Sequence, residues 1–226
     1  IMDVIHTVDT VNIRTGKKKV FTNNECKYTY RNSLFKSSEP STYLIVSATF
    51  RLKKVYEELE ISYHERKARY GSLEEELKTF AKEPYSIEDV MNAVINQRTK
   101  KLPSIDEYGT CGSVFANPTV TTEKYLSLCK VIPELQSYPV EKLLYTRKDW
   151  NHIEDKYVKI PAGRIIDELG WRGKWIGNVG VHQKHALCVV TNRKASGKEV
   201  LDFLKEIKRD VKKKYDVDLK YEINII

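Results

Sequence analysis

Residues 109–118 have the sequence GTCGSVFANP, and this stretch decides how the rest of the chain is interpreted. Its two glycines can adopt positive φ angles and let the backbone approach another group closely. Ser113 follows the second glycine, and Asn117-Pro118 is a turn signal. These features predict a loop. The residues alone leave two interpretations open, a plain loop and a loop that holds a functional serine.

The composition is that of a soluble globular protein. The chain has 226 residues, of which 41% are hydrophobic and 31% charged, enough for one large or two small domains with a sizeable core. No apolar run is long enough for a transmembrane helix, and the N-terminal residues do not form a signal peptide. We expect a cytoplasmic protein without a membrane partner.

The cysteines do not have the spacing of a metal site. There are four, far apart in the sequence, namely Cys26, Cys111, Cys129 and Cys188. Since none belongs to a Cys-x-x-Cys pair, we predict no metal site. Reduced thiols in a cytosolic protein are the simplest interpretation.

The formal net charge is +8, with lysine runs at residues 17–19 and 212–214. Such runs usually form a solvated face, but they also attract phosphorylated or nucleic-acid partners. No zinc-finger, basic-zipper or RNA-recognition signature accompanies them. We therefore expect no nucleic-acid partner, and a nucleic-acid-binding domain stays a weak alternative.

The first hundred residues predict a hairpin over 5–21, a short helix after a capping box at 22–25, and a strand over 43–52. Ser72 and Ser86 are expected to cap two helices. In the second helix, five apolar residues recur at helical spacing and are predicted to lie in the core: Ile87, Val90, Met91, Val94 and Ile95. Leu102-Pro103 stops this helix, and a domain boundary is expected there.

The remaining residues predict a helix over 121–132, another from Pro161 to Gly170, and a strand near 186–191. Ser196 begins a long helix with apolar residues on one face, and a final strand is expected over 217–226. Strands and helices alternate without internal repeats. This order is typical of α+β or α/β layers.

Four stretches resemble one known family in their order and approximate spacing: YRNSLFK (30–36), TKKLP with the GSVFANP segment (99–118), IPAGRIIDELGWRGKWIGNVGVHQKHALCVVTN (160–192) and YDVDLKYEINII (215–226). That family is UDP-N-acetylenolpyruvoylglucosamine reductase (MurB), and the resemblance covers nearly the whole chain. It implies an α+β fold. Residues 1–102 would be the C-terminal portion of a PCMH-type (vanillyl-alcohol-oxidase-like) FAD-binding domain, and residues 103–226 a smaller α+β substrate-binding domain.

The resemblance also implies an activity. Family members carry FAD and use NADPH to reduce the enolpyruvyl ether of UDP-N-acetylenolpyruvoylglucosamine, which yields UDP-N-acetylmuramate for peptidoglycan synthesis. Hydride addition leaves negative charge on the neighbouring carbon and its carboxylate. Such a reaction needs groups that neutralise this charge and a group that protonates the carbon.

Three residues match the family's catalytic positions. Ser113 matches the proton donor of the serine loop. Arg31 matches an arginine whose guanidinium can pair with a carboxylate through two hydrogen bonds and would stabilise the developing enolate. Glu222 matches a glutamate that would polarise the enol or orient its partners. The three lie on separate segments, so we expect the fold to bring them together.

The substrate's diphosphate and sugar match further positions. Lys101 would supply positive charge for phosphate, and Asn117 neutral hydrogen bonds. Tyr70 is the better match to a tyrosine that covers the diphosphate, and Tyr63 is the second choice. At His185 the family often has glutamine, so the role of His185 stays open.

The glycine-rich segments with which the family binds the FAD pyrophosphate have no counterpart in residues 1–20. The cofactor-binding residues are therefore unknown. A fragment of a longer protein is the favoured explanation, and a natural truncation is the other. We expect the 226-residue chain to bind FAD poorly and to be a monomer.

Two other functions compete with the reductase. A non-catalytic nucleotide-sugar-binding fragment would not need Ser113, Arg31 and Glu222 together. Another PCMH-type flavin oxidoreductase would not need the serine segment and the Glu222 segment.

Overall fold

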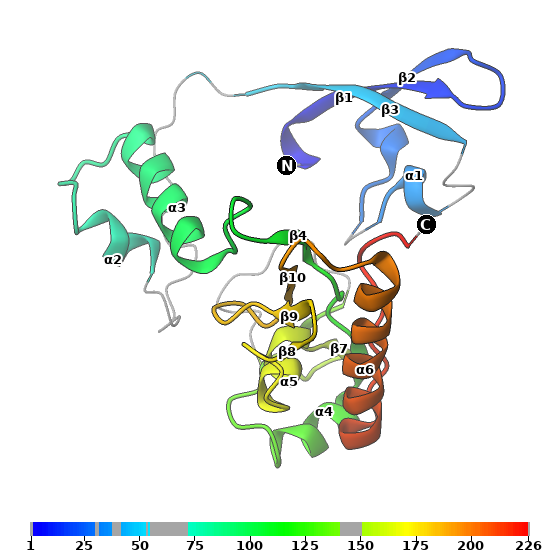
Figure 1. The fold of residues 1–226 in the computed structure, drawn as a ribbon. Coiled ribbons are helices and arrows are strands. Elements are labelled where there is room, and N and C mark those ends of the chain that lie inside the picture. Colours follow the sequence, from blue (N-terminus) through cyan, green and yellow to red (C-terminus); the bar gives the residue numbers. More distant parts are fainter. Residues whose placement is uncertain are drawn as a thin grey trace. The chain divides into compact units, whose positions relative to one another are not determined.

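The computed structural model describes residues 2–29, 32–37, 42–52, 54, 72–140 and 151–225. These residues fall into two compact units, one formed by the described residues up to 54 and the other by 72–140 and 151–225. Figure 1 shows the elements of both units. Helices and antiparallel strands make up the chain, so the predicted α+β class is confirmed. The division between residues 1–102 and 103–226 stays a prediction.

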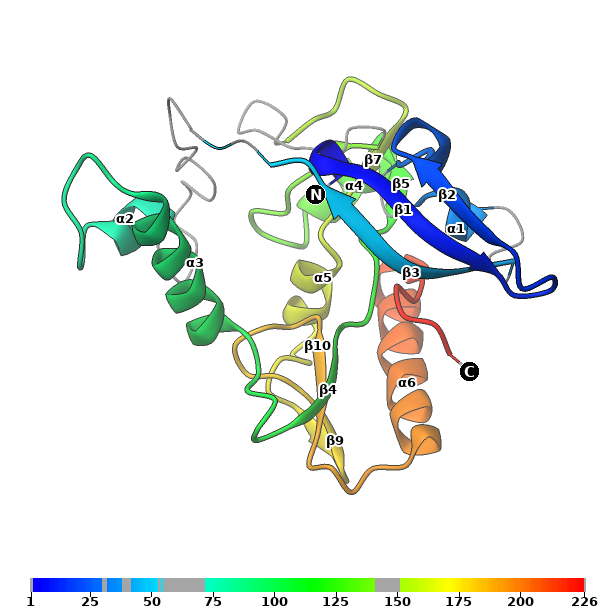
Figure 2. The ribbon, with the colours of Figure 1, turned by 90° about the horizontal axis from the view of Figure 1, so that it is seen from above.

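The first unit is built on a three-stranded antiparallel sheet with the order β2-β1-β3. Its strands are β1 (Ile5–Asn12), β2 (Lys18–Thr22) and β3 (Tyr43–Phe50), and Figure 2 shows β1 between the other two. The turn between β1 and β2 contains Gly16 at a φ of 69°. Short helices complete the unit: η1 (Met2–Val4), η2 (Asn24–Cys26) and α1 (Leu34–Ser37). The predicted hairpin, short helix and strand are confirmed. The predicted capping box at 22–25 is wrong: the Glu25 carboxylate accepts from the Thr22 amide at 2.9 Å, but the helix starts after Asn23 and no side chain caps its amides.

The core of the first unit is small. Val8, Phe21 and Cys26 are its buried members. The Phe21 ring meets Phe35 and Tyr43 edge-on, with ring centroids 5.4 and 5.0 Å apart, an arrangement that aromatic pairs favour. By contrast, most of β3 is exposed, including its aliphatic side chains.

Two helices follow in the second unit, α2 (Leu73–Leu77) and α3 (Ile87–Lys101). Each begins with a complete capping box, as predicted. The Ser72 hydroxyl accepts from the Glu75 amide at 3.0 Å, and the Glu75 carboxylate accepts from the Ser72 amide at 2.7 Å. Ser86 and Asp89 make the same reciprocal pair.

The predicted core face of α3 is largely wrong. Ile87, Met91, Val94 and Ile95 are exposed, Val90 is half-buried, and the fully buried residue of the helix is Ala93. The reason is the size of the partner: α2 has five residues and covers only a narrow stripe of α3. Apolar periodicity therefore predicted the helix but not its burial.

The rest of the second unit contains two antiparallel sheets. The larger has the order β4-β10-β9-β8, with β4 (Gly109–Ser113), β8 (Trp175–Ile176), β9 (Val179–Val181) and β10 (Cys188–Thr191). The smaller has the order β5-β7-β6, with β5 (Thr119–Thr121), β6 (Tyr138–Pro139) and β7 (Tyr157–Lys159). The helices of this part of the second unit are α4 (Thr122–Cys129), α5 (Ala162–Glu168) and α6 (Gly197–Tyr215).

The main core of the second unit draws its buried residues from α4, α5 and α6 and from both sheets. The long helix α6 contributes five buried residues, and Phe203 meets the Trp171 ring edge-on at 5.4 Å. Val181 and Val189 of the sheet and Ile165 of α5 belong to the same cluster. The predicted cap at Ser196 and the apolar face of α6 are confirmed. No helix in the described ranges is both long and apolar enough to cross a bilayer.

The GTCGSVFANP stretch is not a loop throughout. Its first half is strand β4, which pairs with β10. Gly112 has a φ of 75°, and a Cβ on Gly109 would lie 2.6 Å from Thr191 Oγ1, so both glycines are needed by the backbone. The backbone pairing of β4 outweighs its weak strand propensity.

The predicted final strand over 217–226 is also absent from the described residues. In its place lies an extended segment with a single β-bridge, between Phe115 and Tyr221. Val217 and Leu219 are buried in the main core, while the residues beside them are exposed. The alternation that predicted a strand is therefore real, but the ladder of hydrogen bonds does not extend beyond one bridge.

Candidate functional site

Ser113 is the last residue of the edge strand β4 and is half-buried. In the antiparallel register it lies opposite Cys188 of β10. Its side chain is therefore held at the end of a paired strand, where the chain turns away toward residues 114–118. Strand pairing therefore fixes the backbone of Ser113, and its side chain lies beside Cys188.

The C-terminal segment runs beside the residues that follow Ser113. The Glu222 amide donates to the Val114 carbonyl at 2.7 Å, and the Ala116 amide donates to the Lys220 carbonyl at 3.0 Å. Phe115 and Tyr221 stack between these two contacts, with ring centroids 5.6 Å apart. The structure thus places the backbone of Glu222 one residue from Ser113, although the two are 109 positions apart in sequence (222 minus 113).

Lys101 is the last residue of α3, and its charge reaches His185 in the turn that leads into β10. Burial, then the Lys101 ammonium group and then His182 lower the pKa of His185 to about 4. The His185 Nδ1 accepts a hydrogen bond from the Leu187 amide at 3.2 Å. His185 is therefore neutral at pH 7 and carries its proton on Nε2.

Cys188 is a buried member of this site that the sequence reasoning missed. Burial raises the pKa of the Cys188 thiol, while the Ser113 hydroxyl and the charge of Lys101 act in the opposite direction. Ser113, Lys101 and Cys188 thus lie within electrostatic reach of one another. A strand near 186–191 was predicted, but nothing in its sequence indicated that Cys188 would face Ser113.

His182 was also missed. It is buried, and its Nδ1 has no hydrogen-bond partner among the described residues. Burial lowers the pKa of His182, Lys184 acts in the same direction, and Glu107 acts against them. Its ring meets Tyr108 edge-on at 5.9 Å. Its position in the quoted stretch, three residues before His185, was the available signal.

Asn117 has a structural role that the sequence did not indicate. Its Oδ1 accepts from the Ala162 amide at 3.0 Å and so caps the N-terminus of α5. Asn117 also lines an open pocket of about 500 Å³, together with Lys124 and Lys220. Ser113 does not line this pocket. The predicted contact of Asn117 with a substrate stays a prediction.

Three predicted site residues, Arg31, Tyr63 and Tyr70, lie outside the described residues. The expected approach of Arg31 to Ser113 and Glu222 therefore stays a prediction. The same holds for the choice between the two tyrosines.

The described residues do not fit the pyrophosphate of a flavin nucleotide. Such a group needs several free backbone amides from a glycine-rich turn or a helix N-terminus. In the first unit the described glycine is Gly16, which lies in an exposed hairpin turn. We therefore assign no FAD-binding residue in this chain.

These features define an α+β protein whose second unit brings a serine-bearing edge strand, a terminal glutamate and a helix-end lysine into one region. A family model described as the C-terminal domain of UDP-N-acetylenolpyruvoylglucosamine reductase matches residues 103–226. Since this match covers more than half of the chain, the chain belongs to the UDP-N-acetylenolpyruvoylglucosamine reductase family.

Individual relatives bear the same name. The chain is 34% identical over its whole length to a UDP-N-acetylenolpyruvoylglucosamine reductase of Flavobacterium johnsoniae and 32% identical to one of Bacteroides fragilis. It spans 61% of the length of each. A crystal structure of the reductase from Thermus caldophilus matches 97% of this chain and 53% of its own, with a TM-score of 0.50 and 17% identity. That last likeness concerns the fold alone.

Proposed function

We propose that this chain belongs to an enzyme that reduces UDP-N-acetylenolpyruvoylglucosamine to UDP-N-acetylmuramate, with FAD and NADPH as its redox cofactors. The observation that carries the proposal is the pairing of the C-terminal segment with residues 114–116, through which the backbone of Glu222 lies beside that of Ser113. Family membership supplies the substrate class. The product would serve peptidoglycan synthesis in the cytoplasm.

The flavin would supply the hydride, and the chemistry proposed for this chain concerns protons and charge. Ser113 would donate a proton to the carbon next to the substrate carboxylate. A serine hydroxyl is a weak acid, so it must act within a fixed hydrogen-bond environment. The end of β4 and the opposing Cys188 provide a rigid frame for it. Glu222 would orient the enol and its partners, and Arg31 would pair with the carboxylate.

Lys101 would bind the diphosphate of the substrate. Its ammonium group makes no ion pair in the part of the chain that the structure describes, and its charge reaches His185 and Cys188 near Ser113. A cation without an ion pair among the described residues, close to a half-buried serine, suits a ligand with a phosphate near its reacting end. Asn117 and Tyr70 would add contacts to the sugar and the diphosphate.

The first unit would be the C-terminal portion of a PCMH-type FAD-binding domain. Its small core and its exposed strand β3 support this assignment, since such a sheet needs further apolar cover to be stable. We expect the 226-residue chain to act as a monomer and to bind FAD weakly.

Calorimetric titration of the chain tests the proposal without any need for turnover. We expect UDP-N-acetylenolpyruvoylglucosamine to bind and FAD to bind weakly or not at all. Ser113→Ala is the matched control, because it removes the proposed proton donor but no binding group, and it should leave the substrate affinity within about twofold.

Two outcomes would contradict the proposal. A folded chain, verified by circular dichroism, that does not bind the substrate would remove the substrate-domain assignment. Tight FAD binding would show that the flavin is held by residues assigned no such role here. A nucleic-acid-binding function would instead appear as an affinity for oligonucleotides that falls steeply with salt.

A further inference from the structure

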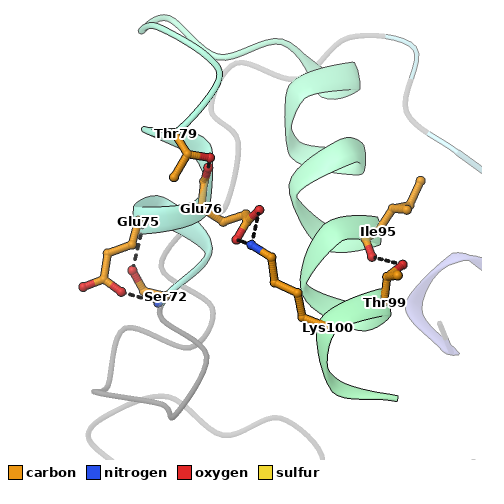
Figure 3. Close-up of polar contacts among 7 residues, drawn as sticks. All are labelled: Ser72, Glu75, Glu76, Thr79, Ile95, Thr99 and Lys100. Atoms are coloured by element: carbon orange, nitrogen blue, oxygen red, sulfur yellow. Dashed lines mark hydrogen bonds and ion pairs between the residues drawn. The ribbon is translucent and has the colours of Figure 1, made fainter. Parts of the chain in front are cut away.

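Two neighbouring lysines at the end of α3 have different surroundings. Lys100 is paired with Glu76 of α2, and its Nζ lies 2.9 and 2.6 Å from the two carboxylate oxygens (Figure 3). Lys101 has no ion pair among the described residues, and its charge acts on His185 and Cys188. The last turn of α3 therefore has one lysine held in an ion pair and one whose charge reaches the candidate site.

Glu76 is unusual for a carboxylate because its side chain is only 6% exposed. It lies in α2 between the buried residues Leu73 and Leu77. A buried carboxylate needs a partner, and removal of that partner leaves an uncompensated charge. Lys100 is the cation that meets this need: its side chain is 56% exposed, but its ammonium group is held beside α2 by the contact with Glu76.

Fixing Lys100 also fixes the direction of Lys101. Successive residues of an α-helix project about 100° apart around the axis, so the side chain of Lys101 leaves the helix in a different direction from that of Lys100. The helix stays regular up to this point, because the Leu102 amide donates to the Arg98 carbonyl at 2.8 Å and the Thr99 hydroxyl to the Ile95 carbonyl at 2.9 Å. The chain then becomes extended at Leu102.

We propose that Glu76 is a positioning residue for diphosphate binding: by holding Lys100 it orients the last turn of α3 so that Lys101 faces the diphosphate of a nucleotide ligand. The inference rests on the proposed function of Lys101. Glu76 itself does not touch the ligand, and the effect on binding passes through the backbone that Lys100 and Lys101 share.

The test compares two ligands that differ in the diphosphate, UDP and uridine, by NMR titration of the 226-residue chain. Lys101→Met should weaken UDP binding on the order of tenfold and leave uridine binding unchanged, as expected for loss of one charge-assisted contact. Glu76→Gln should reduce the preference for UDP over uridine in the same way, by about three- to tenfold. A merely structural role of Glu76 would change both affinities together.

The rescue variant exchanges the partners. Glu76→Lys combined with Lys100→Glu restores an ion pair of reversed polarity, and it should return the preference for UDP to within about threefold of the unmodified chain. If Glu76→Gln fails to fold, judged by circular dichroism, this double variant answers the question alone. A folded double variant that no longer prefers UDP would overturn the inference.

The remaining outcomes separate the two proposals. If Lys101→Met leaves UDP binding unchanged, the proposed function of Lys101 is wrong. If Lys101→Met weakens UDP binding and a folded Glu76→Gln does not, the inference about Glu76 is wrong and the proposed function stands.

Discussion

Helices α3 and α6 begin in the same way and are buried in opposite ways. Both start with a serine capping box and both carry an apolar stripe at helical spacing. In α6 the stripe lies in the main core, with Ile207 fully buried. In α3 the equivalent stripe is exposed, with Ile95 at 51%. The difference shows that capping and periodicity specify a helix, while burial depends on whether another element is present to cover it.

The difference in burial between α6 and α3 predicts a large difference in the cost of truncating an isoleucine. Ile207→Ala should lower the free energy of unfolding by about 2–5 kcal/mol, because it removes three carbons from a closely packed core and leaves a cavity. Ile95→Ala is the matched control, the same substitution in an exposed helix, and should change the free energy by about 0.5 kcal/mol or less. Urea unfolding followed by circular dichroism measures both.

An equal cost for the two isoleucine variants would contradict this account. It would mean that the stripe of α3 is covered in solution. Helix α3 would then be a second core helix.

A glycine in the sheet against which α6 packs should also be costly to replace. A Cβ on Gly180 of β9 would lie 2.4 Å from the Trp175 ring, which rests on the glycine across the strand pair. Gly180→Ala should therefore lower the free energy of unfolding by about 1–3 kcal/mol through displacement of the indole. Trp175 fluorescence should change in the folded protein, which provides a direct readout of that displacement.

Gly197→Ala is the control for Gly180→Ala. Gly197 is the first residue of α6, and a Cβ there would meet nothing within 4 Å. Alanine should be neutral or slightly stabilising, by about 0.4–1 kcal/mol, because it restricts the unfolded chain. Equal destabilisation at the two sites would mean that contact with Trp175 is not the cause.

The pH dependence of stability tests whether the end of α3 lies near His185. The pKa of His185 is lowered to about 4 by burial first and by Lys101 second. A histidine with a lowered folded pKa stabilises the protein above its unfolded pKa, near 6.5, and this contribution is lost as the pH falls toward 4. For a partly solvated imidazole the loss should be roughly 1–2 kcal/mol.

His185→Gln should remove this pH dependence between pH 6.5 and 4. NMR titration of the imidazole should also show that Lys101→Met moves the pKa of His185 upward. A titration midpoint that stays the same in Lys101→Met would show that α3 does not end beside His185.

Much of the fold could be predicted from the sequence because its signals are local. The capping boxes at Ser72, Ser86 and Ser196 and the β-branched run at 43–50 each specify their own element. Strand β4 could not be predicted, because its weak strand residues are held by hydrogen bonds to β10, some 75 positions later. The burial of the apolar face of α3 was mispredicted for a similar reason, since it depends on the length of α2 and not on the sequence of α3 itself.

The candidate site could be predicted only in part. The motifs pointed to Ser113 and Glu222 separately, and the approach of their backbones depends on a hydrogen bond from the Glu222 amide to the carbonyl of Val114, in a distant segment. Cys188 could not be predicted, because strand register decides which side chain lies opposite Ser113. The helix-capping role of Asn117 likewise depends on α5, which begins 45 residues later.

Helices α3 and α6 share a serine N-cap, and removal of that cap should cost each helix only a little stability. Ser196→Ala and Ser86→Ala each remove the hydroxyl that accepts the third amide of the helix, at 3.2 Å in α6 and 3.1 Å in α3. Each change should lower the stability of its helix by about 1 kcal/mol, because a cap acts locally and independently of the packing beyond it. Hydrogen exchange of the first-turn amides measures the effect in each helix.

Threonine in place of either serine is the control, since it retains the capping hydroxyl and should recover most of the loss. The two alanine variants should also differ in how much of the protein they destabilise. Because α6 is packed along its length, the loss at Ser196 should appear in global unfolding, whereas the loss at Ser86 should stay within the exchange of α3 amides. If Ser86→Ala lowered global stability as much as Ser196→Ala, the exposed stripe of α3 would have to be coupled to the main core. Both helices would then be packed against other elements, and they would differ only in which elements those are.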